Sequence, residues 1–254
     1  MRILFVSEEV APFANATEIA LIARLIPEQL QESGECDVRI MMPRYGQISE
    51  RKNRLHEVIR LSGNDIRING QKEPLKVKVA SIPGIRLQVY FMDNSNFFKR
   101  KGILSDREGS VFTDNVERAY FFSRSVLQTI RNLGWQPDIV HCFGWLSSLT
   151  PLLLRTEFSD DPIFARTRSV YTPGLESSDQ QVSASFMSEL VYPDGLMPHT
   201  LSVSEMASHL ADHTIHLPSA NGSAKGGMRF AAEAGACCEQ ATQLYEQVLN
   251  EVAV

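Results

Sequence analysis

The sequence lacks the features that mark several classes of protein. Its 254 residues include four cysteines (Cys36, Cys142, Cys237 and Cys238), and no two of them form a C-x-x-C pair. We therefore expect neither a disulfide framework nor a cysteine zinc site. The same pattern predicts a reducing, cytoplasmic location. No apolar run is long enough to cross a bilayer, and the N-terminus enters a strand-like segment without the pattern of a signal peptide.

The sequence also has fewer basic than acidic residues. Lys and Arg number 25 against 30 Asp and Glu, which gives a formal net charge of −5 and a pI near 5.7. Proteins that bind nucleic acid usually carry a basic excess on one face, so neither nucleic acid nor a membrane is an expected partner. With 43% hydrophobic and 22% charged residues, the composition is that of a globular protein with a large core.

Strand-like and helix-like segments alternate from the start of the chain. Residues 2–7 are a short apolar run, typical of a strand that is buried on both faces. Residues 18–33 carry apolar side chains at helical spacing, Gly34 closes that helix, and a second strand is predicted at 37–42. Strand, helix and strand in this order predict a βαβ unit with parallel strands and a right-handed crossover.

The remaining pattern continues this alternation with one interruption. Residues 75–80 and 86–91 nearly alternate in polarity around Pro83-Gly84, which predicts a β-hairpin inserted after the first βαβ unit. Further elements are predicted as helices at 114–133 and 145–155 and as strands at 138–142, 168–172 and 200–204. We therefore expect an α/β fold: one Rossmann-like domain at 1–216 with a mostly parallel sheet and helices on both faces. A linker at 217–227 and a C-terminal helix at 228–254 that packs back on the domain are expected to follow.

Several segments, in order, resemble one known family. They are MRILFVSEEVAPFA at 1–14, DVRIMMPRYG at 37–46, TDNVER at 113–118 with its FFSR sequel, and WQPDIVH at 135–141. Over about residues 1–204 their order and spacing resemble the N-terminal domain of bacterial glycogen synthases and plant starch synthases. The resemblance implies half of a GT-B glycosyltransferase. That family transfers glucose from ADP-glucose to an α-1,4-glucan across a cleft between two Rossmann-like domains, and the second domain has no counterpart in this sequence. Residues 238–249 resemble the family's closing helix.

The most specific motif of the family is altered here. Its Lys-x-Gly-Gly-Leu-Ala-Asp segment binds phosphate through the lysine and through glycines at a helix N-terminus. The corresponding residues read NATEIAL at 15–21, so Asn15 replaces the lysine and Glu18 replaces a glycine. Thr17 is then expected to be a plain N-cap with Glu18 in the first turn. The resemblance therefore implies a family member that has lost its donor site.

Three further motifs of the family are changed. His-Asp-Trp has become Phe143-Gly144-Trp145, which removes a carboxylate, and Thr-Ile-His-Asn has become Thr172-Pro-Gly-Leu175, which removes a histidine. A loop tyrosine expected before Asp106 is replaced by Leu104 or Ile103. Sugar transfer needs charge stabilisation of the leaving diphosphate, so we expect no catalytic residue, cofactor or metal in this chain.

Eight residues remain candidates for contact with a ligand in the expected cleft. Two carboxylates follow the first strand at the carboxyl edge of the sheet, where α/β proteins bind ligands, although a solvated loop is the alternative. The histidine ends a strand, and the aromatic rings could stack on a sugar, with core packing as the alternative for each. The candidates are Glu8, Glu9, Asn15, Thr17, Tyr45, His141, Trp145 and Thr172.

Three histidines form a separate pattern. His209, His213 and His216 follow one another at i, i+4 and i+7, with Glu205 one turn earlier. On a helix this spacing could bind zinc or nickel, although such histidines also occur on ordinary exposed faces.

Three hypotheses on function remain open from the sequence. The first is a family member without transferase activity of its own that binds a saccharide such as an α-glucan, or regulates a partner. The second is a protein-interaction or homodimerisation module that uses the face left by the second domain. The third is a half-enzyme completed in trans by a separate chain.

Overall fold

Strand β1 (Arg2–Ser7) lies in the middle of the sheet because its side chains are apolar on both faces. In this computed structural model, which describes residues 1–174, 186, 190–193, 201–220 and 228–251, β1 pairs in parallel with β2 (Asp37–Pro43) and β7 (Ile139–Phe143). Helix α1 (Glu18–Ser33) makes the crossover from β1 to β2 and ends at Gly34, whose φ of 76° is left-handed.

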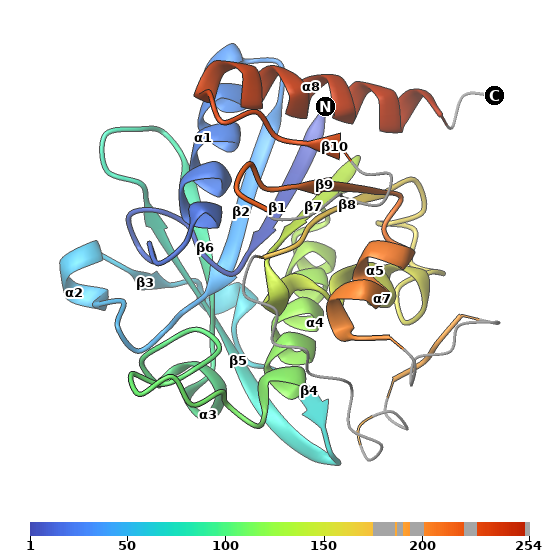
Figure 1. Ribbon diagram of the computed structural model, residues 1–254. Helices are drawn as coiled ribbons and strands as arrows, with labels where there is room; N and C mark the ends of the chain where they lie inside the picture. The colour runs from blue at the N-terminus through green and yellow to red at the C-terminus, as the bar shows by residue number, and fades with distance from the viewer. Residues whose placement is uncertain (175–185, 187–189, 194–200, 221–227, 252–254) are drawn as a thin grey trace.

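The sheet extends from β1 in both directions (Figure 1). Beyond β7, parallel pairing continues through β8 (Arg168–Thr172), β9 (His213–His216) and β10 (Met228–Arg229). Beyond β2, β6 (Gln88–Asp93) pairs in parallel, and β5 (Gln71–Ser81), β3 (His56–Glu57) and β4 (Asn64–Ile68) add antiparallel pairs. The predicted α/β fold with adjacent parallel strands is confirmed. The inserted hairpin is part of the main sheet, because β6 pairs directly with β2.

Helices cover both faces of this sheet. The longer ones besides α1 are α4 (Asn115–Leu133), α5 (Thr150–Arg155), α7 (Val203–Leu210) and α8 (Ala234–Asn250). Short elements lie in the connections: α2 (Glu50–Asn53), α3 (Ser95–Phe98) and the 3₁₀ turns η1 (Ile59–Leu61) and η2 (Trp145–Ser147). On β7, His141 contacts Tyr245 of α8, whereas the next residue, Cys142, interacts with Thr150 of α5. Successive strand residues point to opposite faces, so α8 and α5 lie on opposite sides of the sheet.

Two predicted elements are wrong in the region before β9. Of the strand expected at 200–204, residue 200 lies outside the described residues, Val203 and Ser204 begin α7, and the strand lies at β9 instead. Ser202 accepts a hydrogen bond from the Glu205 amide, and the Glu205 carboxylate binds the Ser202 amide, a capping box that starts a helix at this point. The helix expected at 145–155 is also divided, into η2 and α5, with Pro151 at the start of α5.

With these boundaries the three histidines do not lie on one helix, as their spacing had suggested. His209 lies in the last turn of α7, whereas His213 and His216 lie in β9, so the three do not share a helix face. Among the described residues, no group of three or more His, Cys, Asp or Glu side chains is arranged to hold a metal ion. No helix in the same residues is long and apolar enough to span a membrane.

Helix α8 packs on α1 and on the centre of the sheet. It begins at residue 234 and not at 228, because Met228 and Arg229 pair with β9 and the Glu233 carboxylate caps the amides of the first turn. Its inward side chains join the main core; they are Cys237, Cys238, Ala241, Leu244, Tyr245 and Val248. The far end of α8 is held to β9 by a hydrogen bond of 2.9 Å between His213 Nε2 and Glu251 Oε2. Residues 221–227 and 252–254 of the expected linker and helix lie outside the described residues.

The packing of α8 predicts how substitutions on it will act. Leu244→Ala should lower the free energy of unfolding by about 2–5 kcal/mol, because it leaves a cavity between α8 and the sheet. Gln243→Ala on the exposed face should change it by less than about 0.5 kcal/mol. Urea unfolding followed by circular dichroism measures both values. Equal effects would show that α8 adds nothing to the stability of the domain.

Candidate functional site

The candidate site lies at the carboxyl ends of the parallel strands, beside the start of α1. A pocket of about 220 Å³ is bounded by Glu8, Thr17, Gln47 and the loop at 102–106. A second pocket of about 420 Å³ adjoins it, shares Gln47, Gly102 and Asp106 with it, and is also lined by Lys101 and Arg107. The two pockets together are called the depression below. Open α/β sheets bind ligands at this edge.

The N-terminus of α1 is already occupied by oxygen atoms of the chain. The Glu9 carboxylate accepts hydrogen bonds from the amides of Ala16 at 2.8 Å and Thr17 at 2.9 Å, and from the Thr17 hydroxyl at 2.5 Å. The Thr17 hydroxyl in turn accepts from the amide of Ile19 at 3.3 Å. Amides at a helix start can bind an external anion, and here the amides of Ala16, Thr17 and Ile19 are bound by oxygen atoms of the chain instead.

A second carboxylate adds negative charge at the same helix end. Glu18 lies in the first turn of α1, and its Oε2 accepts hydrogen bonds from the Ser219 hydroxyl at 2.5 Å and the Ser219 amide at 3.4 Å. The short segment after β9 is thereby tied to the start of α1. A phosphate group here would meet the carboxylates of Glu9 and Glu18, which repel it.

The Glu8 carboxylate fills space that a glycine leaves open. A Cβ atom at Gly144 would lie 2.1 Å from Glu8 Cδ and Oε1, and Gly144 has a φ of +82°. A Cβ at Gly174 would lie 3.4 Å from the same Oε1 atom, and Glu8 Oε2 accepts a hydrogen bond of 3.1 Å from the Leu146 amide. Glu8 therefore takes this position because residue 144 has no side chain.

A buried arginine fixes the loop that forms the outer wall of the pocket. Arg118 of α4 donates to the carbonyl oxygens of Phe97 at 3.0 Å and Ile103 at 2.5 Å, and to Asn115 Oδ1 at 2.6 Å. Asn115 donates to the Leu104 carbonyl at 2.8 Å. Burial lowers the pKa of Arg118 to about 10, so it remains charged at neutral pH. The sequence analysis missed this role, although both residues belong to the TDNVER segment.

Four of the expected ligand contacts are core residues in the structure. Tyr45 is buried and donates to the Glu8 carbonyl at 2.8 Å, and burial raises its pKa well above the usual value. Trp145 is 1% exposed, so its ring cannot stack on a sugar. His141 Nε2 lies 2.8 Å from the Thr172 hydroxyl, and its Nδ1 lies 2.7 Å from the Tyr245 hydroxyl. In the structure these four residues are buried, and none of them lines the pocket of about 220 Å³.

The other four expected residues lie at the surface of the site or just beneath it. Glu8 and Thr17 line the pocket, Glu9 lies beneath the start of α1, and Asn15 is exposed in the loop before it. Gln47 and Ser105 also line the pocket and were missed. Gln47 could have been found from its place just after the carboxyl end of a predicted parallel strand, whereas Ser105 lies in a loop with no such signal.

Comparison with known proteins gives consistent matches. A family model described as the starch synthase catalytic domain matches residues 2–215. The glycogen synthase of Chlorobium limicola is 41% identical over 172 residues, which are 67% of this chain and 35% of that protein. The glycogen synthase of Pelodictyon phaeoclathratiforme is 39% identical with the same two shares. The chain thus spans about a third of the length of these curated relatives.

A solved structure agrees with the fold. The catalytic domain of starch synthase IV from Arabidopsis thaliana, bound to ADP and acarbose, has a TM-score of 0.67 to this chain at 17% identity. The match covers 97% of this chain and 50% of the starch synthase chain. At this identity the likeness establishes the α/β architecture.

The contact between Glu8 and Gly144 predicts a specific coupling. Gly144→Ala should destabilise the protein more than Gly134→Ala, because both positions have positive φ but a Cβ at Gly134 meets nothing within 4 Å. Adding Glu8→Ala should relieve the clash and give a favourable coupling of about 1–3 kcal/mol with Gly144→Ala. Denaturant unfolding of the single and double variants measures it. Strict additivity would refute the proposed contact.

The buried His141 predicts a pH dependence of stability. Burial lowers the pKa of His141 well below 6.5, so the native state stays unprotonated while the unfolded chain takes up a proton below about pH 6.5. Stability should therefore fall as pH drops below that value, by up to about 1.4 kcal/mol per unit from this residue, and be unaffected by it above pH 7.5. His141→Asn should remove this part of the slope, whereas His56→Gln at an exposed position should not. Imidazole NMR signals of His141 that titrate near pH 6.5 in the native protein would contradict the prediction.

Proposed function

Because the chain belongs to the starch synthase catalytic domain family, we propose that it binds an α-glucan or related saccharide and transfers no glucose by itself. The proposed site is the depression between the start of α1 and the loop at 102–106. The related starch synthase IV was solved with ADP and acarbose, so in that protein the fold holds both a nucleotide and a saccharide. This chain retains the fold but differs in the groups that would meet a diphosphate.

The observation that carries the proposal is that two carboxylates of the chain lie at the N-terminus of α1. Glu9 binds the amides of Ala16 and Thr17, and Glu18 adds a further negative charge in the first turn. Holding a nucleotide diphosphate would require positive potential there, and Asn15 stands where the family has a lysine. The repulsion at the start of α1 disfavours ADP-glucose, and the cations that line the larger pocket, Lys101 and Arg107, lie on its loop side and not at the helix end.

A neutral saccharide does not meet the same obstacle. Its hydroxyl groups donate hydrogen bonds, and the depression offers the carboxylates of Glu8 and Asp106 with the amide of Gln47 and the hydroxyl of Ser105. Arg118 and Asn115 hold the loop that carries Ser105 and Asp106, so the site is largely pre-formed. A pre-formed polar site lowers the entropy cost of binding.

The alternative of a half-enzyme completed in trans has less support. A partner chain would have to bring enough positive charge to offset Glu9 and Glu18 at the helix end. In addition, Gly144 and Gly174 stand where the family's motifs have an aspartate and a histidine. A regulatory role for a saccharide-binding protein and a cytoplasmic location are further parts of the proposal. The four described cysteines are all free, which suits a reducing compartment.

Ligand-induced stabilisation tests the proposal. Maltooligosaccharides should raise the melting temperature, by an amount equivalent to about 2.7 kcal/mol at a concentration 100 times the dissociation constant, whereas ADP-glucose should leave it unchanged. Glu8→Gln should reduce the saccharide-induced shift, and Glu108→Gln at an exposed position outside the pocket should not. A shift with ADP-glucose alone would refute the proposed loss of the donor site.

A transfer assay tests the catalytic part separately. The purified chain should move no glucose from radiolabelled ADP-glucose to glycogen above a heat-treated control. An active glycogen synthase run in parallel shows that the assay works. Turnover by the chain alone would overturn the proposal, and turnover only after addition of a second chain would support the half-enzyme.

A further inference from the structure

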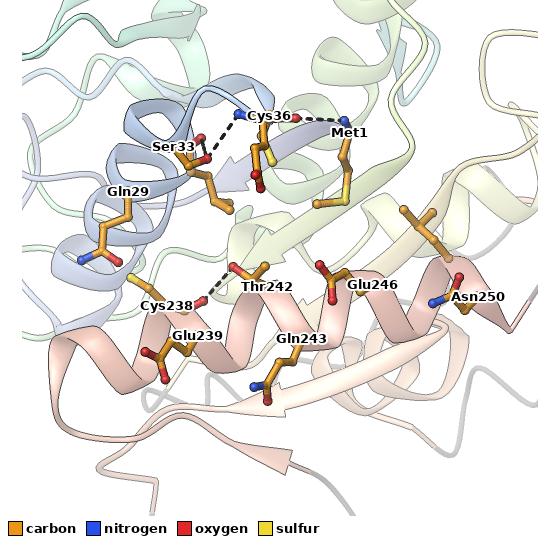
Figure 2. A pocket seen from close by; sticks show the side chains of 13 residues that line it. Met1, Gln29, Ser33, Cys36, Cys238, Glu239, Thr242, Gln243, Glu246 and Asn250 are labelled. Atoms are coloured by element: carbon orange, nitrogen blue, oxygen red, sulfur yellow. Dashed lines mark hydrogen bonds between the residues drawn. The ribbon is translucent and has the colours of Figure 1, made fainter.

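A groove between α1 and α8 lies away from the proposed saccharide site (Figure 2). Its volume is about 630 Å³, larger than that of either pocket at the strand ends. Met1, at the start of β1, lines the groove, whereas Glu8, just past the end of β1, lines the saccharide pocket. The two cavities therefore lie at opposite ends of the central strand, and both can be occupied at once.

The groove has an apolar floor and an acidic rim. The floor is formed by Leu30 and Cys36 on the α1 side and by Cys238 and Leu249 on α8. Three exposed glutamates line the groove, and none of its lining residues is Lys or Arg. They are Glu35, Glu239 and Glu246. The Met1 α-ammonium adds one positive charge at the β1 end, where it donates to the Glu35 carbonyl at 3.2 Å, so the rim along α8 is acidic. An apolar floor beside an acidic rim is typical of a surface that receives a complementary chain.

The shape of the groove follows the axis of α8. Cys238, Thr242 and Glu246 recur every fourth residue along one side of the helix, and Asn250 continues the row. Thirteen residues of helix from 238 to 250 correspond to a length of about 18 Å, which matches a docked helix of about three turns. Figure 2 shows these side chains in a row along α8, with Gln29 and Ser33 of α1 across from its Cys238 end and Met1 across from Glu246.

We propose that this groove binds an amphipathic α-helix of a partner protein that carries an apolar stripe flanked by Lys or Arg. The apolar stripe would lie on the floor, in the helix-in-groove mode. Glu239 and Glu246 are seven residues apart, about 10.5 Å along α8, so they pair best with two cations seven residues apart on the partner helix. Charge complementarity selects a basic helix and rejects an acidic one.

The groove is independent of the proposed saccharide binding. Its α8 side, residues 238–250, lies beyond residue 215, where the match to the family model ends. The groove also does not use the strand ends, where the proposed saccharide site lies. A failure of saccharide binding would therefore leave this inference standing.

The test uses two labelled peptides and the full chain. One 14-residue helical peptide carries a leucine stripe with two lysines seven residues apart, and the second has glutamates in place of those lysines. Fluorescence anisotropy should show saturable binding of the lysine peptide and none of the glutamate peptide. Glu239→Lys with Glu246→Lys should weaken binding of the lysine peptide by roughly tenfold.

Matched controls separate the groove from the overall negative charge. Glu32→Lys with Glu57→Lys changes the net charge equally at exposed positions outside the groove and should leave the affinity unchanged. Thr242→Trp should block the floor and abolish binding without altering the saccharide-induced shift. Absence of binding by the lysine peptide, or equal weakening by both double variants, would overturn the proposal. A dimer that forms with rising concentration and is abolished by Glu239→Lys with Glu246→Lys would assign the groove to a second copy instead, and would equally overturn it.

Discussion

The position of the Glu8 carboxylate depends on the missing side chain at Gly144, and the candidate site is organised around that contact. Glu8 extends from the end of the central strand into space that any Cβ at residue 144 would occupy. Its other oxygen is bound by the Leu146 amide, and its backbone carbonyl accepts the hydroxyl of the buried Tyr45. The carboxylate of the next residue, Glu9, accepts hydrogen bonds from two amides at the start of α1. Two consecutive residues thus supply negative charge to two walls of the same depression, which favours hydroxyl donors over phosphate.

Buried hydrogen bonds beneath this edge fix the position of α8 on the sheet, which apolar packing alone would not specify. His141 connects Thr172 of β8 to Tyr245 of α8, with its ring stacked on Phe143 at 3.9 Å between ring centroids. Because these groups are buried, each needs its partner, and together they fix where α8 lies on the sheet. The position of α8 in turn creates the groove beside α1. A saccharide site and a protein-docking groove at opposite ends of β1 would allow the same chain to join a glucan to a partner protein.

Much of the fold was predictable because it follows from local patterns. The apolar run at 2–7, the strand-like segments at 37–42 and 168–172 and the helical spacing at 18–33 predict the parallel core, and the observed strands and helix agree closely. The errors occurred where short-range polar contacts compete with apolar pattern. Ser202 and Glu205 start a helix through side-chain bonds to backbone amides, although residues 200–204 alternate in polarity as a strand would.

For the candidate site too, part was predictable from the sequence and part depends on the tertiary structure. The sequence by itself predicts that the lysine, the glycines and the polar residues of the family's motifs are replaced, because the resemblance is read from residue identity along the chain. Only the tertiary structure decided that Glu8 fills the space at Gly144, that Tyr45, His141 and Trp145 are buried, and that Arg118 holds the loop wall. Each of these contacts joins residues that lie far apart along the chain. Their burial and partners follow from how the strands and helices pack, which no local pattern specifies.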